Sequence, residues 1–356
     1  MFAYDETGRR YTLNPSTDKG GEGRICLIEG NSGLCAKLFK TDSVSKDKYA
    51  KVKEWLRLKD LDTELCNQVS IPCACLYSRP ELQDLSTFAG YTMERFTDCF
   101  SLTDVYTKPL DYRAKLACAL NLCIASGNLH KKGIIIGDFN SDNVLMFRNS
   151  RVRLIDTDSM QLVIESGGYR ILRCCTALKP EFAPPEIEQR LKAAGKTNLK
   201  SVAQSIENPI FNENTDNYML AWHIFALLMN GAAPYSSMAD KDELLRHPSK
   251  TLSDVDLSRS NAAKRGEFIY AKKCGMRKPP DYAPPYDILI HDLRALFEKS
   301  FIDGAANPQA RPGPADYFEA LIKYASSLAE RPCGHYMPSH YKGSCVWCAL
   351  TTPKRR

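Results

Sequence analysis

The stretch that decides the fold reads His130-Lys-Lys-Gly-Ile-Ile-Ile-Gly-Asp138-Phe-Asn-Ser-Asp-Asn143 and, after ten further residues, Leu154-Ile155-Asp156-Thr157-Asp158. Phosphoryl transfer from ATP needs one carboxylate to orient the attacking hydroxyl group. It also needs an amide and a second carboxylate to hold Mg²⁺ on the phosphates. Asp138, Asn143 and Asp156 have the spacing that this chemistry requires. The stretch therefore predicts a phosphate-transfer site.

A glycine-rich turn lies near the start of the chain, between strand-like runs at 11–13 and 25–28. Glycine lets backbone N–H groups approach phosphate closely, because no Cβ atom intervenes. An ordinary glycine-containing hairpin has the same pattern, so the turn alone decides little. We expect phosphate contacts from Gly20, Gly21, Gly23 and Ile25.

A lysine follows in the next predicted strand, Leu34-Cys35-Ala36-Lys37-Leu38-Phe39, where it can pair with the α- and β-phosphates. A helix is predicted over residues 45–67, in the place where protein kinases, which this part of the chain resembles, carry an acid that clamps the lysine. Glu54 is our candidate for that acid and Glu64 is the alternative. For either residue, a solvated place on the helix surface is the competing interpretation.

Two more strands are predicted within residues 72–96. The second runs into the segment that contacts adenine in protein kinases, which this part of the chain resembles, and the candidate residues there are Met93, Glu94 and Phe96.

Three landmarks follow downstream in a fixed order. Phe182-Ala-Pro-Pro-Glu186 precedes an apolar helix that starts at Asp216 and ends at Gly231. Arg311 then follows in Asn307-Pro-Gln-Ala-Arg311-Pro312. A buried charge must be paired, and arginine offers a two-pronged donor to a carboxylate. We therefore expect Arg311 to pair with Glu186.

Together these motifs resemble the protein kinase superfamily over roughly residues 10–327. The loop Gly-Asp-Phe-Asn-Ser-Asp-Asn, Asp-Thr-Asp-Ser in place of Asp-Phe-Gly, and a Cys/His tail are similar to a bacterial branch of serine/threonine-kinase-like proteins. The resemblance implies an α+β, two-lobed kinase-like fold. We expect a β-rich N-lobe over 1–97, a mainly helical C-lobe over 98–328 and a zinc-binding tail over 329–356.

The same resemblance implies ATP and Mg²⁺ (or Mn²⁺) as cofactors, and a Ser/Thr-containing protein as substrate. It also implies association with PP2C-type phosphatases and von Willebrand A-type proteins in stress or tellurite-resistance clusters.

The chain departs from the kinase pattern at several positions. Ile136-Gly137 replaces the His-Arg pair, whose arginine receives an activation-loop phosphate. Phosphorylation of Thr176 is therefore not expected to act through that contact. Asp158 replaces a glycine, which adds a carboxylate near the metals or tightens the turn through its side chain. Asn140 stands in place of a lysine and Asp18 in place of the first phosphate-loop glycine. Lys37, Asp138, Asn143 and Asp156 are retained, which favours an active enzyme.

The tail carries Cys333-Gly-His335-Tyr-Met-Pro-Ser-His340 and then Cys345-Val-Trp-Cys348. Two cysteines at this spacing can direct both sulfurs to one ion, and four protein ligands make a structural Zn²⁺ site. We expect the ligands Cys333, His340, Cys345 and Cys348, with His335 as the alternative histidine. A redox Cys-x-x-Cys lacks its usual sequence context here.

The composition is that of a globular protein: 356 residues, 44% hydrophobic and 25% charged, with a net charge of +6. No signal-like or membrane-spanning run is apparent, and 14 cysteines in a chain of this size indicate reduced thiols. We expect a cytoplasmic protein with no membrane or nucleic-acid partner.

Three functions compete. The first is an ATP/Mg²⁺-dependent serine/threonine kinase. The second is a nucleotide-binding pseudokinase that serves as a scaffold for a phosphatase or von Willebrand A partner. The third is an adaptor whose zinc tail does the binding. Asp138 argues against the second, and the scarcity of basic residues around the Cys/His cluster argues against DNA binding in the third.

Overall fold

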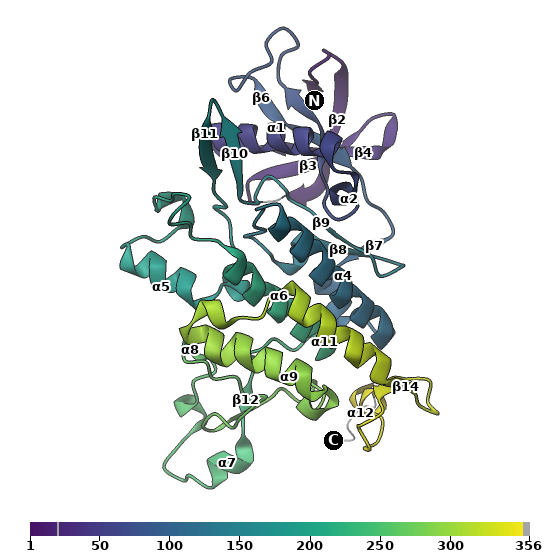
Figure 1. Ribbon diagram of the computed structural model, residues 1–356, viewed down its shortest axis with the longest axis vertical. Coiled ribbons are helices and arrows are strands. Elements are labelled where there is room, and N and C mark those ends of the chain that lie inside the picture. Colours follow the sequence, from purple (N-terminus) through teal and green to yellow (C-terminus); the bar gives the residue numbers. More distant parts are fainter. Residues whose placement is uncertain (20, 352–356) are drawn as a thin grey trace.

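Six antiparallel strands close into a barrel at one end of the molecule, in the order β1-β2-β3-β4-β6-β5 (Figure 1). The computed structural model describes residues 1–19 and 21–351. Alternate side chains of the strands point inward and form a small apolar cluster that includes Leu13, Cys26 and Leu76. The strands are β1 (Phe2–Tyr4), β2 (Arg10–Lys19), β3 (Gly23–Ile28), β4 (Asn31–Phe39), β5 (Pro72–Tyr77) and β6 (Phe88–Glu94).

The helix predicted over 45–67 is divided into α1 (Lys46–Leu61) and α2 (Thr63–Cys66). Ser45 caps α1 by accepting a hydrogen bond from the N–H of Lys48. Asp62 ends α1 and caps α2, because its side chain accepts from the N–H of Leu65. Val52 and Trp55 on α1 are fully buried, so this helix packs firmly against its neighbours.

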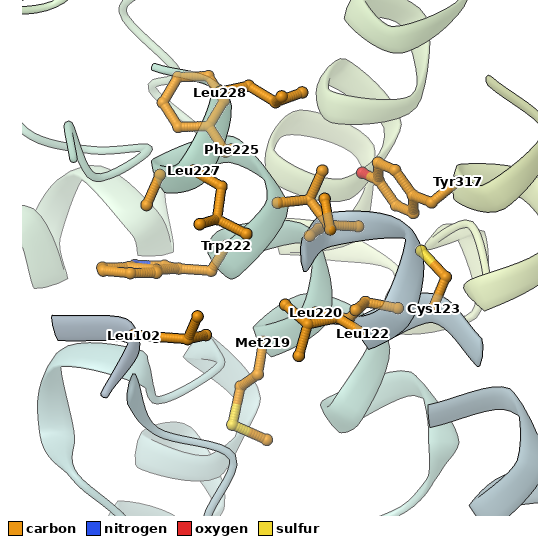
Figure 2. Packing of buried hydrophobic residues seen from close by; sticks show 14 of the residues in the cluster. Leu102, Leu122, Cys123, Met219, Leu220, Trp222, Phe225, Leu227, Leu228 and Tyr317 are labelled. Atoms are coloured by element: carbon orange, nitrogen blue, oxygen red, sulfur yellow. The ribbon is translucent and has the colours of Figure 1, made fainter. Parts of the chain in front are cut away.

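The rest of the chain is mainly helical and surrounds α6 (Glu213–Leu228). Every residue of α6 from Thr215 to Leu228 is buried, which suits its apolar composition on all sides. Figure 2 shows Leu220 and Phe225 of α6 among Leu122 of α4 (Tyr112–Lys131) and Tyr317 of α11 (Pro314–Ser327). The other helices are α3 (Leu102–Thr107), α5 (Pro185–Ala193), α7 (Lys241–Leu245), α8 (Arg259–Lys264), α9 (His291–Glu298), α10 (Gly304–Ala306) and α12 (Val346–Thr351).

Short antiparallel sheets carry the connections between these helices. A three-stranded sheet has the order β7-β8-β9, and β10 with β11 forms a hairpin that stands beside α1 (Figure 1). Their bounds are β7 (Cys99–Ser101), β8 (Val144–Phe147), β9 (Val152–Leu154), β10 (Leu162–Ser166), β11 (Tyr169–Arg173), β12 (Met238–Ala239), β13 (Arg277–Lys278), β14 (Leu328–Glu330) and β15 (Tyr336–Pro338).

This mixed α/β architecture agrees with a kinase-like fold, while the domain boundaries at 97 and 328 stay a prediction. Among the helices of the described ranges, none has both the length and the apolar character needed to cross a bilayer.

The expected pair of Arg311 with Glu186 is present. The guanidinium donates two hydrogen bonds to the Glu186 carboxylate, at 2.6 and 2.8 Å. It also donates to the carbonyls of Asn214 and Gly304, at 3.1 and 2.6 Å. The Arg311 side chain has no exposed surface. One buried arginine therefore joins the start of α5, the start of α6 and α10.

Replacing Arg311 by methionine should lower the free energy of unfolding by about 3–5 kcal/mol, because it leaves the Glu186 carboxylate and two carbonyls without their donor. Urea unfolding measures the change. The matched control is Lys264→Met, which removes the exposed pair with Glu188 and should cost no more than about 1 kcal/mol. Equal losses in the two variants would contradict the structural role of Arg311.

Candidate active site and metal centre

One buried carboxylate holds the loop that carries Asp138. Asp216, in the first turns of α6, accepts hydrogen bonds from the backbone N–H groups of Ile136 (2.7 Å) and Gly137 (2.9 Å). His130 Nε2 lies 3.0 Å from the same carboxylate. Burial by itself would lower the pKa of His130, but Asp216 holds it above its ordinary value. The contact with His130 thus adds a third polar partner for the buried carboxylate of Asp216.

A second residue of α6 that anchors the Asp138 loop is His223, which lies about two turns after Asp216. Burial lowers the pKa of His223 to about 4, so its ring is neutral at neutral pH. A carbonyl can only accept, so Nε2–H donates to the Phe139 carbonyl at 2.9 Å. Nδ1 then accepts from the Tyr106 hydroxyl at 2.5 Å. The backbone on both sides of Asp138 is therefore fixed to α6.

Asp138 and Asn143 are brought together as predicted from their spacing. The Asn143 side-chain amide donates to Asp138 Oδ2 (3.3 Å) and to the Asp138 carbonyl (3.0 Å). Asp138 Oδ1 accepts from the backbone N–H of Lys179 (3.1 Å), so the carboxylate is also tied to the segment before α5. Asp138 stays partly exposed.

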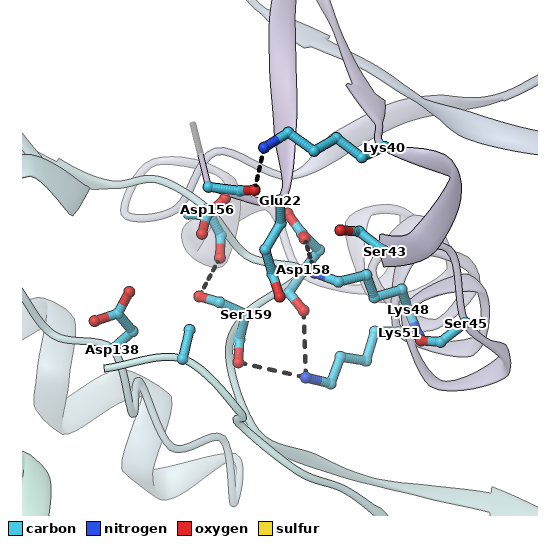
Figure 3. Close-up of polar contacts among 12 residues, drawn as sticks. Glu22, Lys40, Ser43, Ser45, Lys48, Lys51, Asp138, Asp156, Asp158 and Ser159 are labelled. Atoms are coloured by element: carbon cyan, nitrogen blue, oxygen red, sulfur yellow. Dashed lines mark hydrogen bonds and ion pairs between the residues drawn. The ribbon is translucent and has the colours of Figure 1, made fainter. Parts of the chain in front are cut away.

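Asp156 lies opposite, at the end of β9, and contacts the ammonium group of Lys37. Its φ of +67° is unusual for a residue with a side chain, and such strain clusters at functional sites. Burial and the neighbouring Asp158 raise the pKa of Asp156, while Lys37 counteracts them. Ser159 steadies the turn by donating its hydroxyl to the Asp156 carbonyl at 2.7 Å (Figure 3).

Asp158 is a fully enclosed acid beside Asp156. Its Oδ1 accepts from Lys37 Nζ and from the Tyr91 hydroxyl, both at 2.7 Å. Its Oδ2 accepts from Lys48 Nζ at 2.9 Å, and the side chain has no exposed surface. Burial alone would raise the pKa of Asp158, but the two ammonium groups hold it far below its ordinary range. The group is a permanently charged bridge between β4, β6 and α1.

Neither predicted partner of Lys37 on the helix contacts it. Glu54 pairs with Arg57 of the same helix, at 2.5 Å, and Glu64 accepts from the Asn128 amide at 3.0 Å. At 3.6 residues per turn, Glu54 lies roughly a quarter of a turn from the centre of the face that bears Lys48, Lys51 and Trp55. For Glu54 the correction follows from helix phase, since the inward face of α1 carries lysines in place of an acid, whereas Glu64 lies beyond the end of α1, on α2.

Those lysines attach α1 to the loop around Asp158. Lys51 Nζ lies 3.2 Å from the Asp158 carbonyl and 3.3 Å from the Ser159 carbonyl (Figure 3). It also donates to the Cys174 carbonyl at 2.7 Å. Trp55 Nε1 donates to the Thr157 carbonyl at 2.9 Å. Sequence reasoning missed Lys48 and Lys51, because a lysine on a helix is normally solvated.

The glycine-rich turn joins this network through Glu22. The Glu22 carboxylate accepts from Lys48 (2.6 Å) and from Lys200 (2.9 Å). The turn is also held by Lys40, whose Nζ donates to the Gly21 carbonyl at 2.7 Å (Figure 3). Burial raises the pKa of Glu22, but the two lysines bring it below its ordinary value.

The four predicted phosphate-binding positions differ in their placement. A Cβ atom on Gly23 would lie 2.6 Å from the Leu38 carbonyl, so that position must be glycine for packing alone. Ile25 pairs with Lys37 in the barrel register. Gly21 precedes Glu22 in the turn, and Gly20 lies outside the described residues.

The predicted adenine segment lies beside β8 and β9. Met93 and Glu94 end β6, opposite Cys35 and Leu34 of β4. Glu94 accepts from Arg153 at 2.8 Å. The ring of Phe96 meets that of Phe147 edge to face, with centroids 5.6 Å apart. Contact with adenine stays a prediction for these residues.

Gly137 has a physical reason for replacing arginine. Its φ is +73°, and a Cβ atom there would lie 2.6 Å from Cys175 Sγ. Cys175 is fully buried and comes from the segment after β11. The Cys175 thiol thus occupies the space beside Gly137, and packing holds the segment after β11 against the loop that carries Asp138.

A second candidate centre lies in the tail. The ligand atoms of Cys333, His335, Cys345 and Cys348 all lie within 4.8 Å of one another. His335 Nδ1 is 3.5 Å from Cys345 Sγ and 3.4 Å from Cys348 Sγ. Three thiols and an imidazole in this arrangement suit a tetrahedral Zn²⁺ ion.

The prediction of His340 as a ligand is therefore corrected to His335. His340 Nε2 instead lies 3.0 Å from the Asp287 carbonyl. The close spacing of Cys333 and His335 is workable because Gly334 has φ +78° and reverses the chain. Two backbone hydrogen bonds close this chain reversal. The Gly334 N–H donates to the Arg331 carbonyl, and the Arg331 N–H donates to the His335 carbonyl, both at 2.8 Å.

The tail packs against the helical part of the protein. Met337 and Val346 belong to the main apolar cluster. The Trp347 ring lies 4.6 Å from the Tyr112 ring, and Trp347 Nε1 donates to the Tyr336 carbonyl at 3.0 Å. The Cys/His group is thus attached to the start of α4.

Comparison with known proteins places this site in context. The chain is 26% identical to Protein kinase YegI of Escherichia coli strain K12, over 98% of this chain and 50% of that protein. The YegI protein of strain O157:H7 has the same identity and coverage. These relatives support a protein kinase-like superfamily. The chain spans about half the length of the YegI proteins that it matches.

A more distant relative is a Dictyostelium discoideum protein named "Probable inactive serine/threonine-protein kinase". It is 23% identical over 58% of this chain and 16% of its own length. No protein-family model matches the chain.

The contact between Gly137 and Cys175 leads to a stability prediction. Gly137→Ala should lower the free energy of unfolding by well over the roughly 1–2 kcal/mol that a left-handed non-glycine residue costs, because its Cβ atom also collides with the thiol. The control is Gly133→Ala, which has a φ of +69° but no heavy atom within 4 Å of the added Cβ atom. Chemical denaturation compares the two variants, and equal losses would contradict the packing role.

The choice between the two histidines leads to a metal prediction. Purified wild-type protein should contain one zinc per chain by elemental analysis, and His335→Ala should lose most of it because the fourth ligand is gone. His340→Ala should keep the wild-type content. A zinc loss in His340→Ala with retention in His335→Ala would overturn the assignment.

Proposed function

We propose that the protein is an ATP- and Mg²⁺-dependent protein serine/threonine kinase that transfers the γ-phosphate to itself or to a partner protein. The observation that carries the proposal is the convergence of Lys37 on β4, Asp138 and Asn143 in the loop before β8, and Asp156 in the turn after β9, where the Ile155 N–H donates to the Asn143 carbonyl at 2.9 Å. Lys37 contacts Asp156, and Asn143 contacts Asp138.

The donor groups suit the cofactor. Asn143 uses its amide N–H₂ to bind Asp138, which leaves its carbonyl oxygen for a hard cation. Asp156 supplies carboxylate oxygens, and Mg²⁺ prefers oxygen ligands. Asn143 and Asp156 would hold Mg²⁺, or Mn²⁺, which neutralises phosphate charge when bound.

The chain's own residues then have distinct roles. Lys37 binds the α- and β-phosphates, and Asp138 orients the substrate hydroxyl and accepts its proton as the oxygen attacks the γ-phosphorus. The bond from that phosphorus to the ADP oxygen breaks as the new P–O bond forms. The fixed loop keeps Asp138 oriented throughout, because two groups on α6 hold its backbone.

A second candidate is a nucleotide-binding pseudokinase scaffold. Its support is the engagement of Lys37 by two carboxylates, together with the word "inactive" in the name of the Dictyostelium relative. PP2C-type phosphatase and von Willebrand A-type partners would belong to this role as well as to the first. In both cases the Zn²⁺ ion is structural, and the expected location is the cytoplasm.

Incubation with radiolabelled ATP and Mg²⁺ tests the proposal. Asp138→Asn should reduce labelling by about 10²–10⁴-fold, because the group that orients and deprotonates the hydroxyl is lost. Lys37→Met should also abolish most labelling. The matched control is Asp142→Asn, since Asp142 is an exposed acid of the same loop. Equal labelling of wild type and Asp138→Asn would refute the catalytic role, and ATP binding without labelling would favour the scaffold.

A further inference from the structure

A line of alternating charges runs through the site. Lys48 of α1 lies between the carboxylates of Glu22 (2.6 Å) and Asp158 (2.9 Å). Asp158 lies in turn between Lys48 and Lys37, and Lys37 contacts Asp156. Helix α1 thus supplies a positively charged residue, Lys48, where an acidic residue was expected. The acidic residue, Asp158, comes from the loop after β9.

We propose that Asp158 is the positioning residue for Lys37, and that Lys48 of α1 holds Asp158 in place for this task. The inference rests on the proposed function, since it assigns the partner of the phosphate-binding lysine. It reverses the charges of the predicted arrangement, in which Glu54 or Glu64 on the helix would have clamped Lys37.

The enclosure of Asp158 supports positioning over metal binding. Oδ1 is occupied by Lys37 and the Tyr91 hydroxyl, and Oδ2 by Lys48. The side chain has no exposed surface, whereas 27% of the Asp156 side-chain surface is accessible. A cation could reach Asp158 only by displacing one of its three donors, so Asp156 is the carboxylate available to Mg²⁺.

The backbone of the same loop is also attached to α1. Lys51 binds the carbonyls of Asp158 and Ser159, and Trp55 binds the carbonyl of Thr157. Side chain and backbone of Asp158 therefore both follow the position of α1. A shift of this helix would move Asp158, and through it Lys37, although Lys37 has no direct ion pair with the helix among the described residues.

Steady-state kinetics of the Asp158→Asn variant distinguishes a role in positioning Lys37 from a role in binding Mg²⁺. Loss of the charged partner should misplace Lys37, which we expect to raise KM for ATP and lower kcat, with kcat/KM falling about ten- to a hundredfold. The Mg²⁺ concentration for half-maximal rate at saturating ATP should stay within twofold of wild type. Glu54→Gln is the control and should match wild type in every parameter, because Glu54 pairs only with Arg57 among the described residues.

Two results would overturn the proposal. A several-fold rise in the Mg²⁺ requirement of Asp158→Asn, with an unchanged KM for ATP, would make Asp158 a metal ligand. Wild-type kinetics in Asp158→Asn would deny it any role at this site.

A double-mutant cycle tests the part played by Lys48. Lys48→Met alone should lower kcat/KM, and its effect should be smaller in the Asp158→Asn background, because the contact of Lys48 with the Asp158 carboxylate is already lost there and only its contact with Glu22 remains. Independent, multiplicative losses would refute the link. Should Asp158→Asn fail to fold, Tyr91→Phe removes only one hydrogen bond to Asp158 Oδ1 and should raise KM for ATP several-fold. An unchanged KM in that variant would count against the proposal.

The outcome is separable from that of the proposed function. If wild-type protein transfers no phosphate, the kinase proposal fails, and ATP affinity measured by calorimetry replaces KM. Asp158→Asn must then still weaken ATP binding about tenfold relative to Glu54→Gln. Equal affinities of these two variants would reject the positioning role alone.

Discussion

The structure depends on a buried negative charge, that of Asp216 at the start of α6. A carboxylate removed from water must be compensated, and here two backbone N–H groups and His130 compensate it. Because α6 is the most deeply buried helix, the loop tied to Asp216 inherits the rigidity of the core. Asp138 can therefore stay partly exposed without losing its orientation. This order of dependence, from core helix to loop to carboxylate, explains how a loop can hold Asp138 in a fixed orientation.

A second theme is the use of lysine inside the protein. Lys37, Lys48 and Lys51 are all nearly buried, and each is matched by carboxylates or carbonyls. Burial alone would lower the pKa of Lys48, but Asp158 and Glu22 hold it above its ordinary value. Lys51, bound mainly by carbonyl groups, has its pKa lowered by burial. Lys48 and Lys51 thus differ in electrostatic setting although they share one face of α1.

Much of this arrangement was accessible from the sequence. The spacing of Asp138, Asn143 and Asp156 is local, and the strands 10–40 and the pair of Glu186 with Arg311 follow from patterns of polarity and charge. Three features were not accessible. The phase of α1 decides which side chains face inward and excludes Glu54, and the end of α1 at Leu61 places Glu64 on α2 beside Asn128. The left-handed Gly334 brings His335 to the cysteines, where spacing had favoured His340. The contact of Cys175 with Gly137 joins residues that only tertiary structure brings together.

The pair of Lys200 with Glu22 links the connection between α5 and α6 to the glycine-rich turn. More than half of the Lys200 side chain is exposed, so solvent and salt screen the attraction, and an exposed pair of this kind is worth at most about 1 kcal/mol. A restraint that weak is comparable with thermal energy. Because Lys48 also binds Glu22, loss of the Lys200 contact alone would leave the turn attached to α1. The contribution of Lys200 to the position of the turn should therefore be small and should weaken as the ionic strength rises.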